Sequence, residues 1–515
     1  MPKIIKKIRQ STVVKIRLIL SLILLAALSS LILARLVPSG RIFYNRDFSR
    51  SWQFFGGQGF IGQFSPAERI DFKTSDYVKL IADPVYFSVF TPRFFTRARL
   101  IITYQDYLAS STPIVEAGVL MDKIVWQYQM KPVVNKILDN LNWPTLTEGG
   151  LTLYERQKPV ADLAYFIQRA GERSDLALYN YSLLRPYYLD NYSPAKSTRI
   201  MAAGLRGPYQ FYTYLDGEDF NLTFWFQDLN QNYDLKGDGV TVLVSDYKGQ
   251  NILTRRVRDD GIIADTGQLS AQSVLAFVIK DLPRGVYKVE VKANDDIVTR
   301  KIITSQTKLT FINKLWLVDE TVAAFDLYTN VNNLKATAFG PGGEQILAYN
   351  REPLSVDAPY QQFYKRVDFA GPDHLYLINL KPRNLIVENN GLFAFNQAAF
   401  INPDFKKVDS NWEADDSINY ILSAYQSPTV LGPDKIAVLD FDLSNAYREN
   451  HKYSLMISIP GLYANNQARQ LAGLAPAYLE IKEIRLELEG KSLGDKLKEL
   501  WRENIKPKLG LGVKK

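Results

Sequence analysis

Short runs rich in Val, Ile, Thr, Tyr and Phe, separated by Gly, Pro, Asn and Asp, follow one another along most of the chain. Two of these runs, Thr241–Ser245 and Tyr287–Val291, alternate apolar and polar residues with a period of two. Such alternation is typical of a strand with one buried face, and the frequent turn residues favour antiparallel connections. The pattern predicts a mainly β protein, and the chain length indicates about three antiparallel β-sandwich domains.

The individual runs predict where strands lie. Pro132–Leu141 fits neither the helical nor the strand period, so a short helix and a loop both stay open there. The predicted strands are two within Pro84–Tyr104, separated by a turn at Thr91-Pro92, and then Ile124–Met130, Leu151–Arg156, Phe220–Phe226, Val240–Asp246, Ile252–Val257, Val274–Ile279, Val286–Lys292, Ile297–Thr304, Leu309–Leu317, Leu375–Leu380, Leu392–Phe395, Ile436–Leu443, Tyr453–Ile459 and Leu479–Leu488.

The first forty residues differ from this pattern. Six Lys and Arg residues before Leu18 lead into an apolar stretch over 18–37. About 20 apolar residues suffice for a helix to cross a bilayer, and basic flanks stay in the cytoplasm. We therefore expect a cytoplasmic leader over 1–17, a transmembrane signal-anchor in contact with lipid over 18–37, and an extracytoplasmic remainder in a single-pass cell-membrane protein. A cleaved signal peptide is the alternative, because secretory leaders have the same order of basic and apolar residues.

Turn-rich breaks and changes of composition divide the remainder of the chain. The expected series is a β-sandwich over 42–160, a connector over 161–204, an Ig-like β-sandwich over 205–305, a jelly-roll-like β-sandwich over 308–490 and a short amphipathic basic helix in the tail, 491–515.

The Ig-like assignment comes from Leu282–Val291, with the sequence LPRGVYKVEV. This segment resembles the late turn and strand of bacterial Ig-like and fibronectin-like modules, in which Pro and Gly turn the chain and a Tyr opens the strand. The resemblance implies a sandwich of about 100 residues around it.

The jelly-roll assignment comes from Tyr453–Ile459 and Tyr478–Leu488. They resemble the closing strand pair of jelly-roll, galactose-binding-like modules, a class close to carbohydrate-binding modules. In the second strand the alternation slips once at Lys482-Glu483, and a β-bulge can absorb the slip. The resemblance implies that a concave sheet and the loops at one end bind sugars, often with a structural calcium ion buried elsewhere in the module. The sequence alone assigns no aromatic platform to that face.

Composition and charge restrict the possible partners. The chain has no cysteine, so disulfides, thiolate catalysis and Cys-ligated metals are excluded. The net charge of +8 is modest for 515 residues and is concentrated near the two ends, where it suits anionic lipid headgroups better than nucleic acid. We expect no nucleic-acid partner.

The tail carries its apolar residues on one helical face between lysines and arginines; these residues are Leu493, Leu497, Leu500, Trp501 and Ile505. Such a helix can lie in a lipid headgroup layer or pack on the last sandwich. A tyrosine cluster in and beside the connector has two similar interpretations, since tyrosine faces can stack on sugar rings or pack against neighbouring sandwiches. Its members are Tyr179, Tyr181, Tyr187, Tyr188 and Tyr192.

One loop alternates oxygen-bearing side chains in the manner of a calcium site. As an EF-hand it fails, because Tyr233 stands in place of the turn glycine and Gly239 in place of the bidentate glutamate. A looser calcium site and a polar hairpin tip both remain open. Calcium is the cofactor that this pattern suggests, and its candidate ligands are Asp228, Asn230, Asn232, Asp234 and Asp238.

Catalytic signals are weak. His374 and His451 are far apart in sequence. Adjacent acidic residues occur at Asp259-Asp260, Asp295-Asp296 and Asp415-Asp416, but neighbours on a strand point to opposite faces, so these doublets indicate turns. The chain has no nucleophile elbow, P-loop or dinucleotide fingerprint. We therefore expect no catalytic residues.

These observations together favour a non-enzymatic, membrane-anchored protein of a bacterial or archaeal envelope that binds or scaffolds outside the membrane, with a surface glycan or another envelope protein as partner. One alternative is a membrane-tethered glycoside hydrolase or polysaccharide lyase, in which two carboxylates converge within about 5–10 Å in an aromatic-lined groove. Another is a subunit of an envelope or secretion complex, which would expose large apolar patches.

Overall fold

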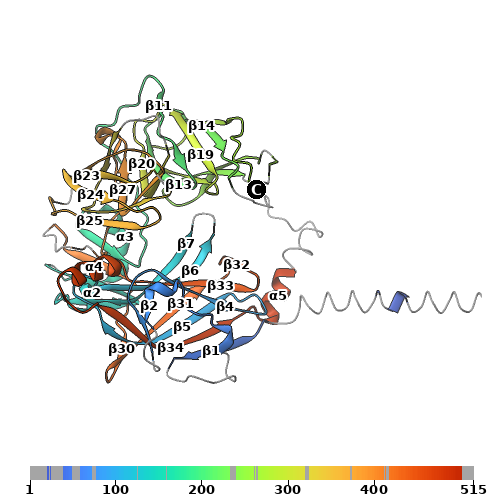
Figure 1. Cartoon of the computed structure of the whole chain (residues 1–515), viewed down its shortest axis with the longest axis vertical. Helices are drawn as coiled ribbons and strands as arrows, with labels where there is room; N and C mark the ends of the chain where they lie inside the picture. The colour runs from blue at the N-terminus through green and yellow to red at the C-terminus, as the bar shows by residue number, and fades with distance from the viewer. Residues whose placement is uncertain are drawn as a thin grey trace, which may run out of the picture.

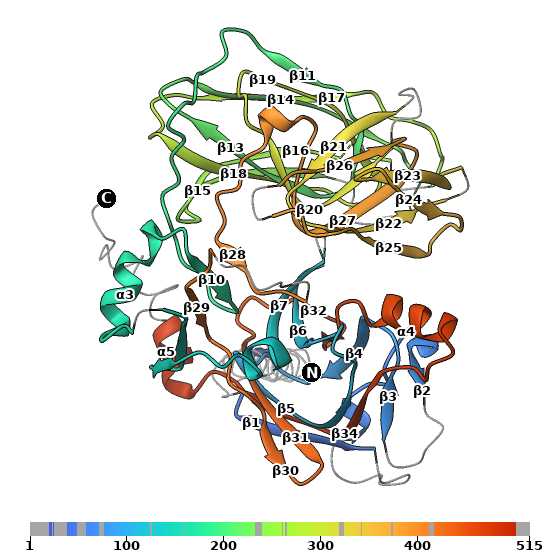
Figure 2. The same cartoon turned by 90° about the vertical axis from the view of Figure 1, so that its left-hand side faces the viewer.

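The computed structural model describes most of the chain. The described residues are 20–22, 24, 39–48, 58–71, 77–123, 126–157, 159–231, 239–259, 261–262, 265–318, 324–340, 342–371, 374–410, 412 and 417–500. They form a mainly β protein with several sheets. Figures 1 and 2 show an upper lobe and a lower lobe, joined by a smaller sheet that contains β10 and β29.

The lower lobe, which we call the outer sandwich, consists of two sheets whose buried faces share one hydrophobic cluster. Each sheet combines strands from the beginning and the end of the described chain. The first sheet contains β1 (Arg41–Asp47), β2 (Ile70–Asp71), β3 (Val78–Leu80), β5 (Arg97–Tyr107), β30 (Thr429–Leu431), β31 (Asp434–Asp442) and β34 (Tyr478–Glu489). The second contains β4 (Val85–Phe90), β6 (Ile114–Asp122), β7 (Gln127–Asn135), β32 (Arg448–Glu449) and β33 (Lys452–Ser458).

A smaller sheet, which we call the middle sheet, joins the two lobes. Its central strand β10 pairs in parallel with both of its neighbours, β28 and β29, so it departs from the expected antiparallel pattern. Its strands are β8 (Thr145–Glu148), β9 (Leu151–Glu155), β10 (Leu176–Tyr179), β28 (Lys406–Lys407) and β29 (Tyr420–Ser423).

The upper lobe, which we call the inner lobe, is a continuous network of seventeen described strands around one hydrophobic cluster. Its two halves are joined at β20, which pairs with β13 on one side and β27 on the other. The strands are β11 (Arg199–Met201), β12 (Leu205–Arg206), β13 (Tyr209–Leu215), β14 (Phe220–Asp228), β15 (Val240–Asp246), β16 (Asn251–Val257), β17 (Ser273–Ile279), β18 (Gly285–Lys292), β19 (Ile297–Thr304), β20 (Thr310–Leu317), β21 (Phe325–Thr329), β22 (Asn333–Ala338), β23 (Gln345–Tyr349), β24 (Glu352–Val356), β25 (Gln362–Arg366), β26 (Tyr376–Leu380) and β27 (Leu385–Ala394).

Helices are short and lie at the margins of the sheets. The α-helices are α2 (Lys136–Asp139), α3 (Leu163–Arg169), α4 (Leu462–Leu471) and α5 (Leu493–Leu500), and the 3-10 turns are η1 (Gln58–Phe60), η2 (Ala67–Arg69), η3 (Ala170–Glu172) and η4 (Gln397–Ala399). Asn135 begins α2, because its side-chain oxygen accepts from the backbone N–H groups of Ile137 and Leu138. The open segment 132–141 is therefore the end of β7 followed by one helical turn.

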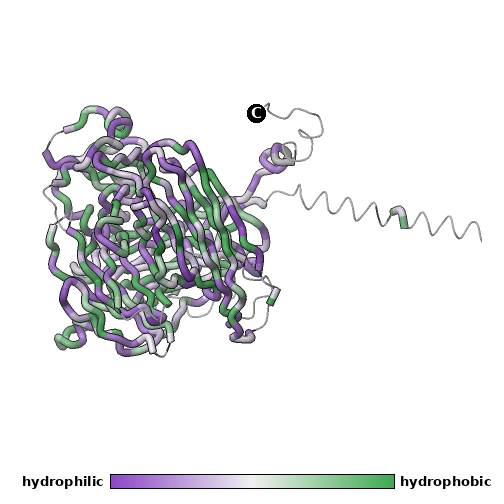
Figure 3. The backbone as a smooth tube through the Cα atoms, turned by 90° about the horizontal axis from the view of Figure 1, so that it is seen from above, coloured by the Kyte–Doolittle hydropathy of each residue, from purple (hydrophilic) through white to green (hydrophobic). Residues whose placement is uncertain are grey.

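The strands form where the sequence alternates. β14 buries every second residue, and the buried set includes Phe220, Phe224 and Phe226. Its other face carries polar residues and Trp225, as a period of two requires. Figure 3 shows the same interleaving of apolar and polar positions throughout the sheets.

Several local predictions are confirmed. β15 and β19 have the predicted bounds, and the turn at Thr91-Pro92 separates β4 from β5. The predicted bulge is present as well, because the β5–β34 register shifts between Ile481 and Glu483, with Lys482 as the extra residue. The segment between Tyr453–Ile459 and Tyr478–Leu488, to which the sequence assigns no element, contains α4.

The observed strand pairing departs from the linear series of domains. Strands from 41–135 pair with strands from 429–489, and the strands of 199–394 form one lobe across the expected boundary at 305–308. The expected connector, 161–204, supplies α3, β10 and β11. The chain is thus nested: the outer sandwich encloses the middle sheet in sequence, and the middle sheet encloses the inner lobe.

The expected anchor, 18–37, falls almost wholly outside the described residues. Within it, Leu20, Leu22 and Leu24 are helical and 60, 55 and 62% exposed. Among the described residues, no helix is long and apolar enough to cross a membrane. The leader 1–17 and the tail beyond Leu500 lie outside the described part, and α5 is the described portion of the predicted tail helix.

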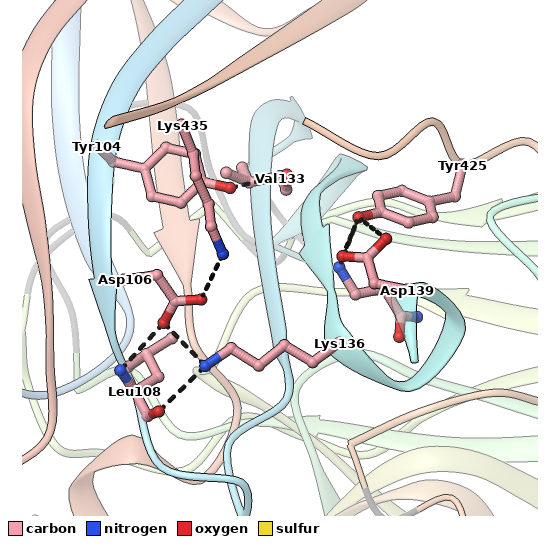
Figure 4. A network of polar contacts seen from close by, with 9 residues as sticks. Tyr104, Asp106, Leu108, Val133, Lys136, Asp139, Tyr425 and Lys435 are labelled. Atoms are coloured by element: carbon pink, nitrogen blue, oxygen red, sulfur yellow. Dashed lines mark hydrogen bonds and ion pairs between the residues drawn. The ribbon is translucent and has the colours of Figure 1, made fainter. Parts of the chain in front are cut away.

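A buried polar network holds the point where the chain leaves the outer sandwich and returns to it (Figure 4). The Asp106 side chain on β5 is only 2% exposed and lies 2.9 Å from Lys136 Nζ and 3.3 Å from Lys435 Nζ. Lys136 begins α2, where the chain departs, and Lys435 lies on β31, where it has returned. Beside them, Tyr425 donates its hydroxyl to Asp139 at 3.0 Å. We call this network the neck.

Replacing Asp106 tests the contribution of the neck to stability. We expect Asp106→Ala to lower the free energy of unfolding by about 3 kcal/mol, because it leaves two partly buried lysines without their carboxylate. Urea denaturation followed by tryptophan fluorescence measures the loss. The control is Asp440→Ala, which removes an ion pair with Arg99. The side chains of Asp440 and Arg99 are 68 and 51% exposed. This replacement should lower the free energy of unfolding by less than about 1 kcal/mol. Equal losses in the two variants would contradict the assignment.

Candidate functional site

An asparagine-rich cleft lies between the inner lobe and the segment that returns from it to the middle sheet. It encloses about 170 Å³. Most of its lining comes from the β21–β22 turn, β27 and the return segment, and Asn313 of β20 and Phe369 after β25 complete it. The lining residues are Asn313, Asn330, Val331, Asn332, Asn333, Phe369, Asn390, Gly391, Leu392, Asn402, Asp404, Phe405, Lys406, Lys407, Asp409 and Trp412.

Side-chain amides fix the inner wall of the cleft. The Asn330 side-chain oxygen accepts from the backbone N–H of Leu392 at 2.8 Å, and the Asn332 amide donates to the carbonyl of Val367 at 3.2 Å. Gly391 permits the close approach of β27 to the β21–β22 turn, because a Cβ there would lie 2.5 Å from Asn330 Oδ1 and 2.7 Å from Val331 Cγ1. The inner wall therefore has a fixed shape.

The outer wall is the return segment, which binds to the inner lobe and the connector. Asp404 accepts from the hydroxyl of Tyr212 at 3.0 Å. Burial, with the nearby Asp404 carboxylate, raises the pKa of Tyr212, so its hydroxyl remains a donor. Arg185 donates to the carbonyl of Pro403 at 3.1 Å and lies 4.7 Å from the ring centroid of Phe405. These contacts hold the outer wall against the inner one.

The surface presented to a ligand combines amides, aromatic rings and charges of both signs. Phe369 is 45% exposed, Trp412 is half-buried, and Asn390 is exposed with its amide 3.4 Å from Asp409 Oδ2. Amides and carboxylates hydrogen-bond hydroxyl groups, and aromatic faces pack on C–H faces. The volume is below the ~300–1,000 Å³ of drug-sized pockets, so the cleft fits one small ring or one polar group.

Glu116 on β6 is electrostatically coupled to this region. It is half-buried, and β6 places it between Pro132 of β7 and Ser458 of β33. Burial, and secondarily the charge of Asp409, raises the pKa of Glu116 to about 7. Glu116 is not among the residues that line the cleft. No sequence pattern points to this pair, because the two residues lie in segments far apart along the chain.

The structure places two of the five candidate calcium ligands. Asp228 ends β14, and its Oδ1 accepts from the backbone N–H of Asn230 at 2.8 Å. The Asn230 amide donates to the carbonyl of Gln268 at 2.9 Å. These bonds are those of a folded turn. Asn232, Asp234 and Asp238 lie outside the described residues, and the described part of the chain holds no group of three or more metal-ligating side chains. The calcium site stays a prediction.

The histidines and the acidic doublets do not form a site among the described residues. His374 packs edge-on against Tyr376, with the ring centroids 4.7 Å apart, whereas His451 lies in the β32–β33 turn beside Arg448. Asp295-Asp296 forms a turn, as predicted. Asp260, Asp415 and Asp416 lie outside the described residues.

Most tyrosines of the cluster pack against the middle sheet or the inner lobe. Tyr179 is in β10 and buried, and Tyr181 packs on the core of the middle sheet. Tyr187 and Tyr192 pack around Tyr214 of the inner lobe, while Tyr188 is 56% exposed. The cluster therefore joins the connector to its neighbours and leaves one tyrosine at the surface.

Comparison with known proteins gives no family assignment. No protein-family model and no curated protein sequence matches the chain. Among solved structures, the VP2 protein of infectious bursal disease virus is 8% identical over 92% of this chain and 83% of its own, with a TM-score of 0.14. Latent PorU of Porphyromonas gingivalis is 11% identical over 69% of this chain and 31% of its own, also with a TM-score of 0.14. Scores this low do not establish a common fold.

The raised pKa of Glu116 predicts a pH dependence of stability. The pKa of Glu116 is about 7 in the folded state, compared with an ordinary 4.5. The protonated carboxyl of Glu116 therefore stabilises the folded state fully below pH 4.5, and this stabilisation is lost as the pH rises through 7. The loss is at most about 3 kcal/mol. We expect Glu116→Gln to flatten the change in unfolding free energy between pH 5 and pH 8, measured by urea denaturation. Glu148→Gln, at an exposed position, should leave the change as it is in the unmodified protein. An unchanged slope in Glu116→Gln would contradict the assignment.

Proposed function

We propose that the chain is a single-pass, membrane-anchored protein of a bacterial or archaeal envelope, and that its extracytoplasmic β-sandwich body binds a surface glycan in the asparagine-rich cleft. The observation that carries this proposal is the cleft, in which amides, carboxylates and aromatic rings from segments far apart along the chain converge. The body acts as a scaffold that holds the binding site in place.

The anchor is supported by the sequence over 18–37 and by its described residues. Leu20, Leu22 and Leu24 are helical and more than half exposed. Three leucines exposed on a helix suit contact with lipid, because a soluble helix would bury such side chains. The basic leader before Leu18 favours an N-terminus in the cytoplasm.

The glycan is supported by the chemistry of the cleft. Sugars are neutral, carry many hydroxyl groups and present apolar C–H faces, and side-chain amides paired with aromatic rings match both features. The cleft supplies Asn390 and Asp409 on one side and Trp412 and Phe369 nearby.

The test is binding of the detergent-solubilised full chain to isolated cell-wall polysaccharide, measured by pulldown. We expect saturable binding that Trp412→Ala and Asn390→Ala each weaken by about tenfold, since one stacking or hydrogen-bonding contact contributes roughly 1–1.5 kcal/mol. The matched control is Trp126→Ala, because Trp126 is 62% exposed and does not line the cleft.

Two results would count against the cleft. Binding that neither cleft variant weakens would place the glycan elsewhere. An absence of binding would favour the envelope-complex alternative, for which the outer face of the inner lobe offers exposed Val274, Val278 and Ile200, at 50, 57 and 65%.

A second candidate function, glycan hydrolysis, rests on the coupling of Glu116 and Asp409. In this alternative Glu116 protonates the leaving glycosidic oxygen and Asp409 takes a proton from the attacking water, so that one glycosidic bond is cleaved. That Glu116 does not line the cleft favours binding over hydrolysis. We expect no release of reducing sugar by the full chain. Release that Glu116→Gln and Asp409→Asn both abolish would establish the enzyme instead.

A further inference from the structure

The two ends of the described body leave the outer sandwich side by side. β1 and β34 pair over seven residues, from Arg41 opposite Glu489 to Asp47 opposite Glu483. Beyond them, the Ser39 N–H donates to the carbonyl of Lys491 at 3.2 Å, and the Gly490 N–H donates to the carbonyl of Gly40 at 2.9 Å. Ser39 and Lys491 therefore lie side by side at one edge of the outer sandwich.

This exit point is closely packed. A Cβ at Gly490 would lie 2.0 Å from the Ser39 Cβ, so only glycine fits there. The carbonyl of Phe94 lies 3.2 Å from the same position, and the Thr96 N–H donates to the carbonyl of Glu489 at 2.9 Å. The β4–β5 turn is thus fixed beside both chain ends.

Large apolar side chains at the exit point face solvent. Phe94 is 72% exposed, Phe43 is 64% exposed and Leu493, at the start of α5, is 48% exposed. The guanidinium of Arg448 lies 4.5 Å from the ring centroid of Phe94. Exposed aromatic rings beside basic groups are typical of surfaces that lie in the interfacial layer of a membrane.

The charges at this place match a lipid headgroup layer. The sheet beside it is balanced by ion pairs, with Arg41 2.9 Å from Glu489 and Arg99 2.8 Å from Asp440. The following segment, 491–500, has three lysines, one aspartate and one glutamate, so it keeps a net charge of +1. Each lysine near an anionic surface contributes roughly 1 kcal/mol of attraction.

We propose that this face, which we call the exit face and define by Phe43, Phe94, Leu493, Lys491, Lys496 and Lys498, rests on the anionic headgroup layer of the membrane that holds 18–37. The proposal rests on the proposed anchor, because the apolar stretch ends just before Ser39. The anchor would bring the face to the membrane, and the exposed rings and the lysines of 491–498 would hold it there. The outer sandwich then has one fixed side toward the bilayer.

The absence of cysteine makes a direct test possible, since a single introduced cysteine labels one position. The full chain is reconstituted into vesicles of phosphatidylcholine and phosphatidylglycerol, with an environment-sensitive fluorophore on Phe94→Cys or Leu493→Cys. We expect blue-shifted emission and at least about twofold quenching by brominated lipid, because an interfacial side chain lies within about 10 Å of the acyl boundary.

The control variant is Leu471→Cys. Leu471 ends α4, and its side chain is 91% exposed. Figures 1 and 2 both show α4 and α5 on opposite sides of the outer sandwich, so a fluorophore at 471 should report water. Replacing Lys491, Lys496 and Lys498 by glutamine should halve the quenching at 94 in these vesicles, because the headgroup attraction is removed.

The outcomes separate this inference from the proposed anchor. A chain that does not float with the vesicles refutes the anchor, and the exit face with it. A chain that floats while positions 94 and 493 both report water keeps the anchor and overturns the exit face. Circular dichroism identifies a labelled variant that has not folded. If one of the two variants fails to fold, the quenching at the other position, 94 or 493, tests the exit face.

Discussion

The buried carboxylate of Asp106 holds the architecture together at its narrowest point. It lies on β5, in the first part of the chain, and binds Lys136 where the chain leaves the outer sandwich and Lys435 where it returns. A carboxylate this deeply buried requires both cations, since one alone leaves much of its desolvation uncompensated. The middle sheet and the inner lobe are therefore an insertion whose two ends are fixed together. Loop-closure entropy grows slowly with length, so a long insertion is tolerated once its ends are joined.

The nested order explains why the cleft lies where it does. The inner lobe must be connected to the middle sheet by a return segment, and that segment passes directly along the β21–β22 turn and β27. Arg185 of the connector holds it from outside through Pro403 and Phe405. The cleft is thus a product of the connection between two cores, which is a common place for a binding site to form.

The sequence predicts the local elements well and their pairing poorly, and both results have physical causes. Period-two alternation depends only on which residues face a core, so β15 and β19 are recognised with their bounds and the extra residue Lys482 is recognised as a bulge. Alternation says nothing about the partner strand, so the pairing of β5 with β34 could not be foreseen. Helix α4 begins at Gly461 without a side-chain cap and buries only Leu462, so it lacks both a start signal and an apolar face. The cleft asparagines resemble ordinary turn residues until the fold brings them together.

The construction of the cleft limits the affinity that it can provide. Asn330 and Asn332 use hydrogen-bonding groups to hold the backbone of Leu392 and Val367, so recognition depends chiefly on the exposed parts of Asn390, Phe369 and Trp412. A few such contacts over about 170 Å³ would give weak binding of a single unit of the proposed glycan. A polymer presents many units, and a membrane holds many copies of an anchored chain at high local concentration. Binding then strengthens through multivalency rather than through a tighter site. In the proposed function, the anchor would thus contribute to glycan binding as much as the cleft does, and the proposed exit face would contribute further by restricting how the body is turned relative to the membrane.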